Sequence, residues 1–236
     1  MVGRCVFMRS TTLVIIPAYN EAATIGQVIK NIKRWCDADI LVVNDGSTDG
    51  TSAAAREEKV AVIDLPCNLG IGGAMQTGYR YACQHGYEFA VQVDADGQHD
   101  PRFIEDLIHP LRAGKVDLVI GSRYIENRNY RGTLARRAGS WFFTFLLKLF
   151  TGQAIYDTTS GFRAINRQVL AEFARHYPSD YPEVEVIMQL LRRGYRIKEI
   201  PVVMYPRKGG HSSITMLKSV YYMFKVSLAM VIDCLR

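Results

Sequence analysis

The sequence has no apolar run long enough to span a bilayer. Residues 138–147 carry no charge over ten positions, and the longest charge-free part of the apolar segment 214–235 is residues 226–232, seven positions long. A transmembrane helix needs about 20 predominantly apolar residues, so we predict no membrane span. We interpret the first segment as a core, re-entrant or interfacial helix. The second is interpreted as an amphipathic helix that lies on a membrane, pairs with a partner chain or packs on its own domain.

Cysteine is scarce, and its spacing argues against a zinc-binding protein and against a small disulfide-rich protein. No C-x-x-C pair occurs, so the sequence predicts neither a zinc site nor a disulfide framework. The five cysteines are Cys5, Cys36, Cys67, Cys83 and Cys234. The N-terminus shows no secretion signal, because its apolar run, residues 13–16, ends at Pro17. These absences favour a reducing, cytoplasmic location.

Charge is divided unevenly along the chain. Residues 1–120 carry 11 Lys and Arg against 15 Asp and Glu, a net charge of −4, whereas residues 121–236 carry 18 against 8, a net charge of +10. The whole chain therefore has a net charge of +6. A basic half of this kind is expected to face an anion, which could be a nucleic acid, an anionic membrane surface or a phosphorylated substrate.

The first half of the chain alternates short β-branched runs with helix-compatible segments. The predicted strands are residues 12–16, 40–43, 60–65, 89–93 and 117–120, with a later one at 195–203 near the edge of the sheet. This alternation predicts an α/β fold with a mainly parallel sheet flanked by helices. We expect one domain over residues 1–210 and a C-terminal amphipathic helix over residues 211–236.

Two carboxylates follow the apolar run that ends at residue 93. Asp94 and Asp96 belong to an Asp-x-Asp-Gly turn, which places both side chains at the carboxyl edge of the predicted sheet. Open α/β sheets bind their ligands at that edge. Oxygen donors in a loop suit Mg²⁺ or Mn²⁺, which take one or two carboxylates and complete their shell with phosphate and water. An isolated turn of this kind would be only a solvated Asp-Gly turn, so the neighbouring motifs matter.

Three further motifs fall at equivalent places after predicted strands. Residues 17–21 follow the first strand where a dinucleotide-binding fold would have G-x-G-x-x-G, which argues against a Rossmann dehydrogenase. Asp45, after the second strand, can accept a hydrogen bond from a base N–H. Residues 68–78 form a glycine-rich loop that leads into a helix, and its glycines would let the backbone approach a ligand.

Together and in this order, these segments resemble the family 2 glycosyltransferases of the GT-A fold, most closely the dolichyl-phosphate mannose synthase-like polyprenyl-phosphate glycosyltransferases. The segments that carry the resemblance are VIIPAYNE (14–21), VVNDGSTDGT (42–51), NLGIGGAMQTG (68–78), DADGQHDP (94–101), GSRY (121–124), TSGFRAINR (159–167) and RKGGHS (207–212). They span nearly the whole chain. The resemblance implies a GT-A, Rossmann-like sheet and a metal-dependent, inverting transfer of a hexose.

The resemblance also implies roles for individual residues. The nucleoside pocket of the nucleotide-sugar donor would be lined by Pro17, Tyr19, Glu21 and Asp45, and Ala95 would lie beside the donor. The metal, Mg²⁺ or Mn²⁺, and the diphosphate would be served by Asp94, Asp96 and Gln98.

Two arginines complete the implied set of catalytic residues with Asp94 and Asp96. Arg123 would lie beside the donor, and Arg207 would bind phosphate. Guanidinium groups suit bidentate phosphate contacts. Close relatives of the mannose synthases carry lysine where this chain has Ile71 and Ser213, so both UDP- and GDP-hexoses stay open as donors.

The implied acceptor is a polyprenyl phosphate, either undecaprenyl or dolichyl phosphate. A phosphate monoester has a second pKa of about 6, so this acceptor needs no general base at neutral pH. The alternative acceptor is a saccharide hydroxyl, which needs a carboxylate base, and Asp157 or Glu185 would be the first candidates. Both have structural alternatives, Asp157 in the turn of residues 158–161 and Glu185 in a helix after residues 181–182.

The basic second half also suggests how the chain meets its lipid. Four arginines, Arg128, Arg131, Arg136 and Arg137, precede the aromatic segment 141–145. Cations beside an interfacial helix attract anionic lipids, so we predict peripheral attachment at the cytoplasmic face of the membrane, directly or through a small integral membrane protein. A homo-oligomer is a further expectation. A basic nucleic-acid-binding protein is the alternative from another class, and we predict against it because the aromatic residues do not interleave with Lys and Arg.

Overall fold

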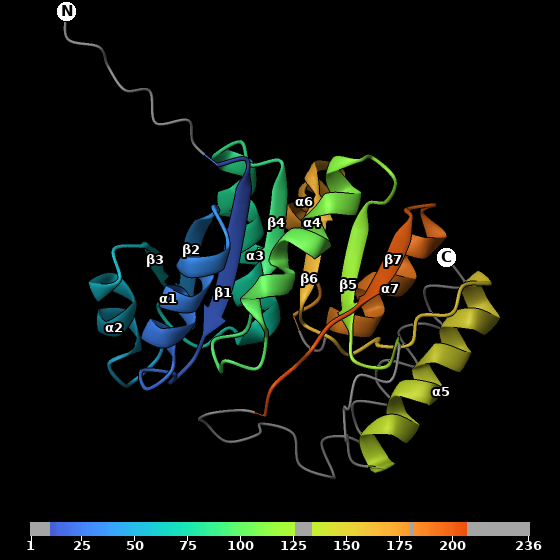
Figure 1. Cartoon of the computed structure of the whole chain (residues 1–236), viewed down its shortest axis with the longest axis horizontal. Helices are drawn as coiled ribbons and strands as arrows, with labels where there is room; N and C mark the ends of the chain where they lie inside the picture. The colour runs from blue at the N-terminus through green and yellow to red at the C-terminus, as the bar shows by residue number, and fades with distance from the viewer. Residues whose placement is uncertain (1–9, 126–133, 180–181, 207–236) are drawn as a thin grey trace, which may run out of the picture.

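The described part of the chain builds a seven-stranded sheet with helices on both faces (Figure 1). The computed structural model describes residues 10–125, 134–179 and 182–206. The strands are β1 (Thr12–Ala18), β2 (Asp39–Asn44), β3 (Ala61–Asp64), β4 (Phe89–Gln92), β5 (Leu118–Ser122), β6 (Arg163–Asn166) and β7 (Ile197–Pro201). The helices are α1 (Ile25–Trp35), α2 (Thr51–Glu57), α3 (Gly70–Gln84), the short 3₁₀ helix η1 (Pro101–Phe103), α4 (Ile104–Arg112), α5 (Leu134–Thr151), α6 (Arg167–Arg175) and α7 (Pro182–Arg192).

The predicted α/β fold is confirmed, with one strand that the sequence pattern missed. The strand order is β3-β2-β1-β4-β6-β5-β7, and β6 alone among these strands runs antiparallel to its two neighbours, β4 and β5. The edge position expected for residues 195–203 is occupied by β7. Within β6 only Ile165 is β-branched and Arg163 is charged, so no local pattern identifies it. Its pairing partners, far away in the sequence, make it a strand.

The sheet separates two hydrophobic layers, as alternation along β1 requires. Leu13 and Ile15 pack with the layer that holds the buried faces of α3, α5, α6 and α7. Val14 and Ile16 pack with the layer that holds α1 and α4. Successive side chains of a strand point to opposite faces, so a central strand covered on both faces is apolar throughout. The carboxyl end of β1 is thereby fixed between two helical layers.

The glycine-rich segment folds differently from the expected loop. Helix α3 begins at Gly70, so most of the segment is helical. A Cβ atom on Gly72 would lie 2.1 Å from the carbonyl oxygen of Pro178, and one on Gly78 would lie 2.4 Å from Cγ2 of Ile15. These two glycines therefore let α3 pack closely on the sheet and on the segment before α7. That role differs from the approach to a ligand that the sequence suggested.

The aromatic segment 138–147 lies within α5, so its prediction as a helix is confirmed. Among the described helices, none combines the length and apolar character that a bilayer crossing requires. The segment 211–236, predicted as an amphipathic helix, lies outside the described residues, as do Arg128 and Arg131.

Asp117 joins three strands at the edge of the sheet opposite to the motif loops. Its carboxylate accepts hydrogen bonds from the backbone N–H of Arg196 at 2.8 Å, from Nε of Arg196 at 3.0 Å and from Nδ2 of Asn166 at 2.9 Å. It thus connects the start of β5 to the end of β6 and the start of β7. Hydrogen bonds from the Arg196 side chain are the main reason that the pKa of Asp117 lies below its ordinary value, and burial opposes them.

We expect Asp117→Asn to lower the free energy of unfolding at pH 7 and to matter less in acid. Because the folded pKa is depressed, the stabilisation by the carboxylate is fully present above the unfolded pKa of about 3.9 and is lost as the pH falls through the folded pKa. Urea unfolding of both proteins between pH 7 and pH 3 would measure this. Asp106→Asn, on an exposed position of α4, is the control. An equal loss of stability for Asp117→Asn at both ends of the range would contradict the electrostatic account.

Candidate active site

The loops that follow β1 and β2 are held together at the carboxyl edge of the sheet. The backbone N–H of Asn20 donates to Oγ of Ser47 at 2.9 Å, and the N–H of Thr48 donates to Oδ1 of Asn20 at 2.9 Å. The N–H of Glu21 donates to Oγ1 of Thr51 at 2.8 Å. Asn20 has a φ of +56°, which asparagine tolerates better than most residues. The two predicted motifs are therefore one connected surface.

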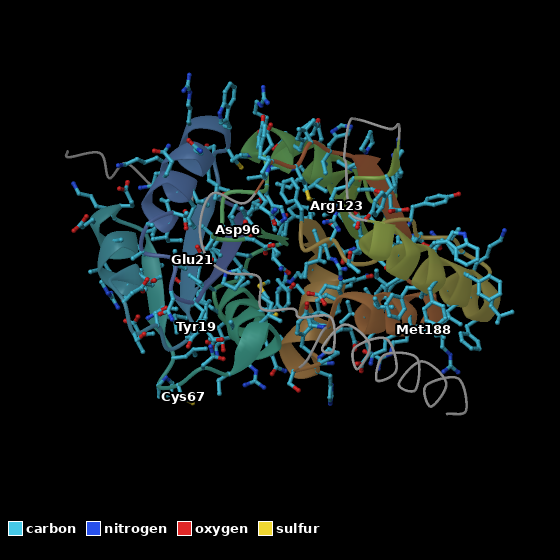
Figure 2. All side chains as sticks on the ribbon, turned by 90° about the horizontal axis from the view of Figure 1, so that it is seen from below. Tyr19, Glu21, Cys67, Asp96, Arg123 and Met188 are labelled. Carbon is cyan, nitrogen blue, oxygen red and sulfur yellow. The ribbon has the colours of Figure 1, made fainter. Side chains whose placement is uncertain are left out.

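Tyr19 and Glu21 differ in how much they are held by the protein. Tyr19 is an exposed aromatic side chain. The carboxylate of Glu21 accepts a hydrogen bond from Oγ1 of Thr24 at 2.8 Å, in the turn that precedes α1. Pro17 lies within β1, where it pairs with Val43 of β2. Tyr19 and Glu21 follow β1, Asp96 follows β4 and Arg123 follows β5, so all four lie near the carboxyl edge of the sheet; Figure 2 labels them.

Asp45 is buried below the segment that leads into α3. Its Oδ1 accepts a hydrogen bond from the backbone N–H of Leu69 at 2.7 Å. Burial raises the pKa of Asp45, although hydrogen bonds from Leu69 and Gly70 oppose this shift. Gly46 has a φ of +68°, and a Cβ atom there would lie 2.6 Å from the backbone of Cys67. Asp45 and Gly46 thus bring the β2 loop against residues 67–70.

Asp94 and Asp96 occupy one turn but have different environments. Asp96 is 3% exposed, and its Oδ1 accepts a hydrogen bond from the backbone N–H of Gln98 at 3.0 Å. The side chain of Asp94 is 35% exposed. Ala95, between them, is buried with the helical layer of α1 and α4. The turn therefore presents one open and one enclosed carboxylate.

His99 is a residue of this turn that sequence reasoning left without a role. Its Nδ1 accepts a hydrogen bond from the backbone N–H of Asp94 at 3.1 Å, and its Nε2 lies 3.5 Å from Oδ2 of the same residue. The ring stacks on Phe162, with centroids 4.7 Å apart. An acceptor Nδ1 places the proton of a neutral imidazole on Nε2, which faces Asp94. In the sequence, the signal for this contact was that His99 follows Asp94 by only five residues.

The chemistry of the turn fits a divalent cation that takes most of its ligands from phosphate oxygens and water. Within the described ranges, no group of three or more His, Cys, Asp or Glu side chains could hold a metal ion. Mg²⁺ commonly binds through one or two carboxylates and fills its shell with phosphate oxygens and water. Two carboxylates in one turn, one of them partly open to solvent, match that mode of binding.

The segment before residue 207 is attached to the acidic turn. The backbone N–H of Tyr205 donates to the carbonyl oxygen of Gln98 at 2.9 Å, and Met204 forms an antiparallel bridge with His99. The hydroxyl of Tyr205 donates to Oδ2 of Asp100 at 3.1 Å. Arg207 itself lies outside the described residues, so its predicted phosphate contact stays a prediction.

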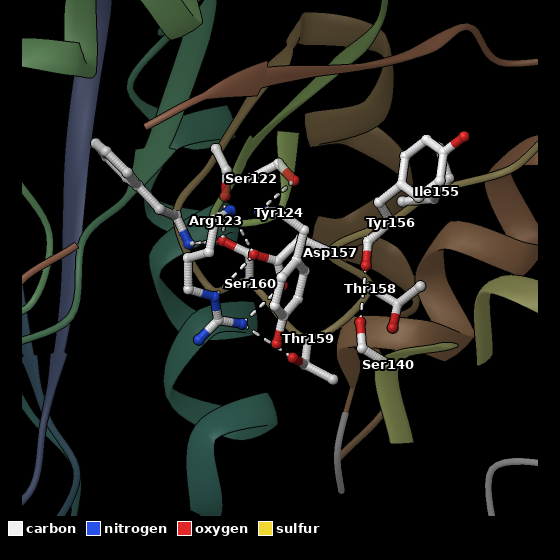
Figure 3. A network of polar contacts seen from close by, with 12 residues as sticks. Ser122, Arg123, Tyr124, Ser140, Ile155, Tyr156, Asp157, Thr158, Thr159 and Ser160 are labelled. Carbon is white, nitrogen blue, oxygen red and sulfur yellow. Dashed lines mark hydrogen bonds and ion pairs between the residues drawn. The ribbon is translucent and has the colours of Figure 1, made fainter. Parts of the chain in front are cut away.

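Arg123 is held in a buried ion pair at the end of β5 (Figure 3). Its Nε and Nη2 lie 2.8 Å and 2.7 Å from the two carboxylate oxygens of Asp157. Its Nη2 also donates to Oγ1 of Thr159 at 3.0 Å. The side chain of Asp157 is fully buried, and both of its oxygens accept bonds from Arg123. This geometry gives Asp157 the task of orienting Arg123 and leaves it unsuited to act as a base.

Glu199 holds the backbone beside the ion pair, and Gly161 places the neighbouring segment against Asp94. Glu199 of β7 accepts hydrogen bonds from the backbone N–H groups of Tyr156 and Asp157 at 2.8 Å and 2.7 Å, and burial raises its pKa. A Cβ atom on Gly161 would lie 3.1 Å from Oδ2 of Asp94. The absence of a side chain at Gly161 therefore lets the TSGFR segment lie against Asp94.

The candidate bases on α7 have different neighbours. The helix expected after residues 181–182 is present, and within it Glu185 accepts a hydrogen bond from Nε2 of Gln189 at 3.1 Å. Burial raises the pKa of Glu183; Arg163 opposes the shift, whereas the charge of Asp94 adds to it. Sequence reasoning named Glu185, and the structure adds Glu183 as a carboxyl group within electrostatic range of Asp94.

A mainly parallel sheet with these motif loops at its carboxyl edge is the arrangement of a GT-A glycosyltransferase. The family model Glycosyl transferase family 2 matches residues 13–173, and the chain belongs to this family.

Relatives with established names extend over most of the chain. The chain is 32% identical over 231 residues to the polyprenol monophosphomannose synthase of Mycolicibacterium smegmatis, covering 92% of this chain and 85% of that protein. It is 28% identical over 243 residues to the UDP-N-acetylglucosamine–dolichyl-phosphate N-acetylglucosaminyltransferase of Methanococcus voltae, covering 93% and 97%.

A solved structure is similar in fold. It is the glucosyl-3-phosphoglycerate synthase of Mycobacterium tuberculosis in complex with Mn²⁺, uridine diphosphate and phosphoglyceric acid. The TM-score is 0.73 at 22% sequence identity, with 94% of this chain and 78% of that chain covered. This similarity agrees with the GT-A fold that the sequence predicted.

Proposed function

We propose that this protein transfers a hexose, with inversion, from a UDP- or GDP-sugar to a polyprenyl phosphate. The observation that carries the proposal is the open carboxylate of Asp94 beside Gly161, at the edge that also presents Tyr19 and Arg123. The names of the two relatives support a polyprenyl or dolichyl phosphate acceptor, and they differ in the sugar. The donor is therefore proposed only as a nucleotide-hexose.

In this proposal Mg²⁺ or Mn²⁺ is the cofactor, held by Asp94, Asp96 and Gln98. The bound ion would neutralise charge on the departing nucleoside diphosphate. The Mn²⁺ in the similar solved structure supports a divalent metal for the fold. Backbone contacts from Tyr205 to Gln98 hold the turn in place, and His99 orients Asp94.

The remaining site residues are proposed to bind the donor. The proposed acceptor, a phosphate, is already anionic at neutral pH. Pro17, Tyr19, Glu21 and Asp45 would line the nucleoside pocket, and Arg123, oriented by Asp157, would contact the donor. Because Asp157 is held in its ion pair, a hydroxyl acceptor would need another base, whereas a phosphate acceptor needs none.

The test of this function is product formation with defined components. Purified protein would be incubated with Mg²⁺ or Mn²⁺, a panel of UDP- and GDP-sugars and undecaprenyl or dolichyl phosphate, and the lipids analysed by mass spectrometry. We expect a metal-dependent glycolipid with a monophosphate linkage. Transfer only to a saccharide would instead identify the hydroxyl-acceptor alternative.

An exposed aromatic stripe on α5 supports the proposal of peripheral membrane attachment. Trp141, Phe145 and Leu149 follow one another every fourth residue and are 70%, 53% and 64% exposed. The rings of Trp141 and Phe145 are stacked, with centroids 6.2 Å apart. Aromatic side chains at helical spacing beside cationic residues are suited to the interface of an anionic membrane. A small membrane protein and a homo-oligomer stay predictions.

We expect Trp141→Ser with Phe145→Ser to weaken binding to phosphatidylglycerol vesicles by about tenfold, since each 1.4 kcal/mol of lost apolar burial corresponds to that factor. Vesicle sedimentation measures it, and nucleotide binding is expected to be unchanged. Trp35→Ser removes a comparably exposed tryptophan, at 53%, from α1 and serves as the matched control. Equal losses in both variants would contradict a membrane role specific to α5.

A further inference from the structure

A basic groove lies between α3 and α6, away from the acidic turn. Its volume is about 430 Å³, and its lining includes Arg80, Arg167 and Arg175 together with Cys83 and Tyr87, without any Asp or Glu. Ligand pockets usually have volumes of about 300–1,000 Å³. The groove therefore combines the size of a small-molecule site with positive charge that its own walls do not balance.

The three arginines of this basic groove differ from most others in the described part of the chain. A carboxylate partner is present for Arg56, Arg102, Arg112, Arg123, Arg193 and Arg196. Among the described residues, no ion pair is formed by Arg80, Arg167 or Arg175, and all three are exposed. Nε of Arg80 donates to the carbonyl oxygen of Ala174 at 3.0 Å, which holds its guanidinium group beside α6.

Cys83 lies in the wall of the basic groove, within electrostatic range of two of these arginines. Burial raises the pKa of this thiol, and the charges of Arg167 and Arg175 oppose the shift. Arg167 and Arg175 line the groove from α6, and Arg80 lines it from α3. Guanidinium groups bind phosphate oxygens through paired hydrogen bonds, which makes phosphoryl groups the best-matched ligand.

The position and length of the basic groove limit the class of ligand that it could bind. Arg167 follows Asn166, which pairs with Phe89 at the amino end of β4, so the groove starts at the edge opposite to Asp94. Figure 1 shows α6 at the end of the sheet where the N-terminal strand enters. Arg167 and Arg175 are eight residues apart on α6, or about 12 Å along its axis. A ligand with phosphoryl groups spaced along the groove can therefore pair with both ends of it at once.

We propose that the basic groove is a second anion site, distinct from the donor site, which binds a ligand carrying two or more phosphoryl groups. The source is either a soluble polyphosphorylated molecule or a lipid headgroup with several phosphates. The proposal does not depend on which sugar the protein transfers.

Calorimetry with inorganic tripolyphosphate in the presence of EDTA tests the proposal, because chelation removes metal-dependent binding at the acidic turn. We expect saturable binding to the whole chain that is at least tenfold weaker in Arg167→Gln with Arg175→Gln. The matched control is Arg34→Gln with Arg192→Gln, which removes the same charge from exposed arginines outside the groove and should change affinity by less than twofold. Equal weakening in the two double variants, or no saturable binding to the wild type, overturns the proposal.

Vesicles separate the two sources. If the headgroup is the source, phosphatidylinositol bisphosphate vesicles will sediment the wild type and the control but not the groove variant, with the aromatic stripe intact in all three. If sedimentation is alike in all three while tripolyphosphate binding is lost only in the groove variant, the ligand is soluble. Thermal unfolding of both variants would check that the substitutions leave the fold intact.

Discussion

Replacing Asp96 with alanine is expected to slow sugar transfer by about 10²-fold or more, comparable to the loss of a preorganised charge-stabilising group. The side chain is 3% exposed and lies at the carboxyl edge of the sheet, where water screens its charge only weakly. The rate at saturating donor, measured over a Mn²⁺ titration, gives the effect. We expect the lower rate to persist at saturating metal.

Two further variants separate charge from structure at Asp96. Asp96→Asn keeps an oxygen that can accept the hydrogen bond from the N–H of Gln98 and removes only the negative charge. We expect it to be nearly as slow as the alanine variant, with its thermal stability retained. Asp106→Ala, on the exposed face of α4, should have the wild-type rate. Turnover close to wild type in Asp96→Ala would overturn the metal assignment.

The local sequence pattern was sufficient to predict the strands and the turn that depend on local composition. β1 and β2 were predicted because their residues are β-branched and apolar, and both are buried on two faces. The acidic turn was predicted because an Asp-x-Asp-Gly sequence ends a strand. Its position at the carboxyl edge then followed from the direction of a parallel sheet.

Features that depend on distant contacts could not be predicted in this way. Strand β6 has a single β-branched residue, and its neighbours β4 and β5 lie about 75 and 45 residues earlier, in the register that the sheet imposes. The bond between Arg123 and Asp157 joins residues 34 apart, and that between Tyr205 and Asp100 joins residues 105 apart. No spacing rule connects such positions.

The same limit applies to the glycine-rich segment, whose packing contacts are distant in the sequence. From sequence, glycines before a helix suggest a loop that approaches a ligand. In the structure, Gly72 faces the backbone of Pro178 and Gly78 faces the side chain of Ile15, so close helix packing accounts for both positions. A glycine marks a place where space is short, and only the fold shows what fills it.

Removing the carboxylate of Asp157 is expected to have the largest effect on stability. Asp157→Ala removes the carboxylate that pairs with the guanidinium of Arg123, which is 11% exposed, and losing one member of a buried pair costs about 3–5 kcal/mol of unfolding free energy. Urea unfolding at pH 7 measures this loss. The exposed pair of Arg56 and Asp64 provides the comparison, because Arg56→Ala should cost at most about 1 kcal/mol.

A double variant distinguishes the structural role of this ion pair from its proposed role beside the donor. Replacing both members with apolar residues of similar size, as in Arg123→Met with Asp157→Leu, removes the unpaired charge, and such replacements are often neutral or stabilising. We therefore expect the double variant to recover most of the stability that Asp157→Ala loses. Transfer should stay low because the guanidinium is gone. Recovery of both stability and transfer would show that Arg123 serves only the fold, since stability would then be the only property that the pair supplies.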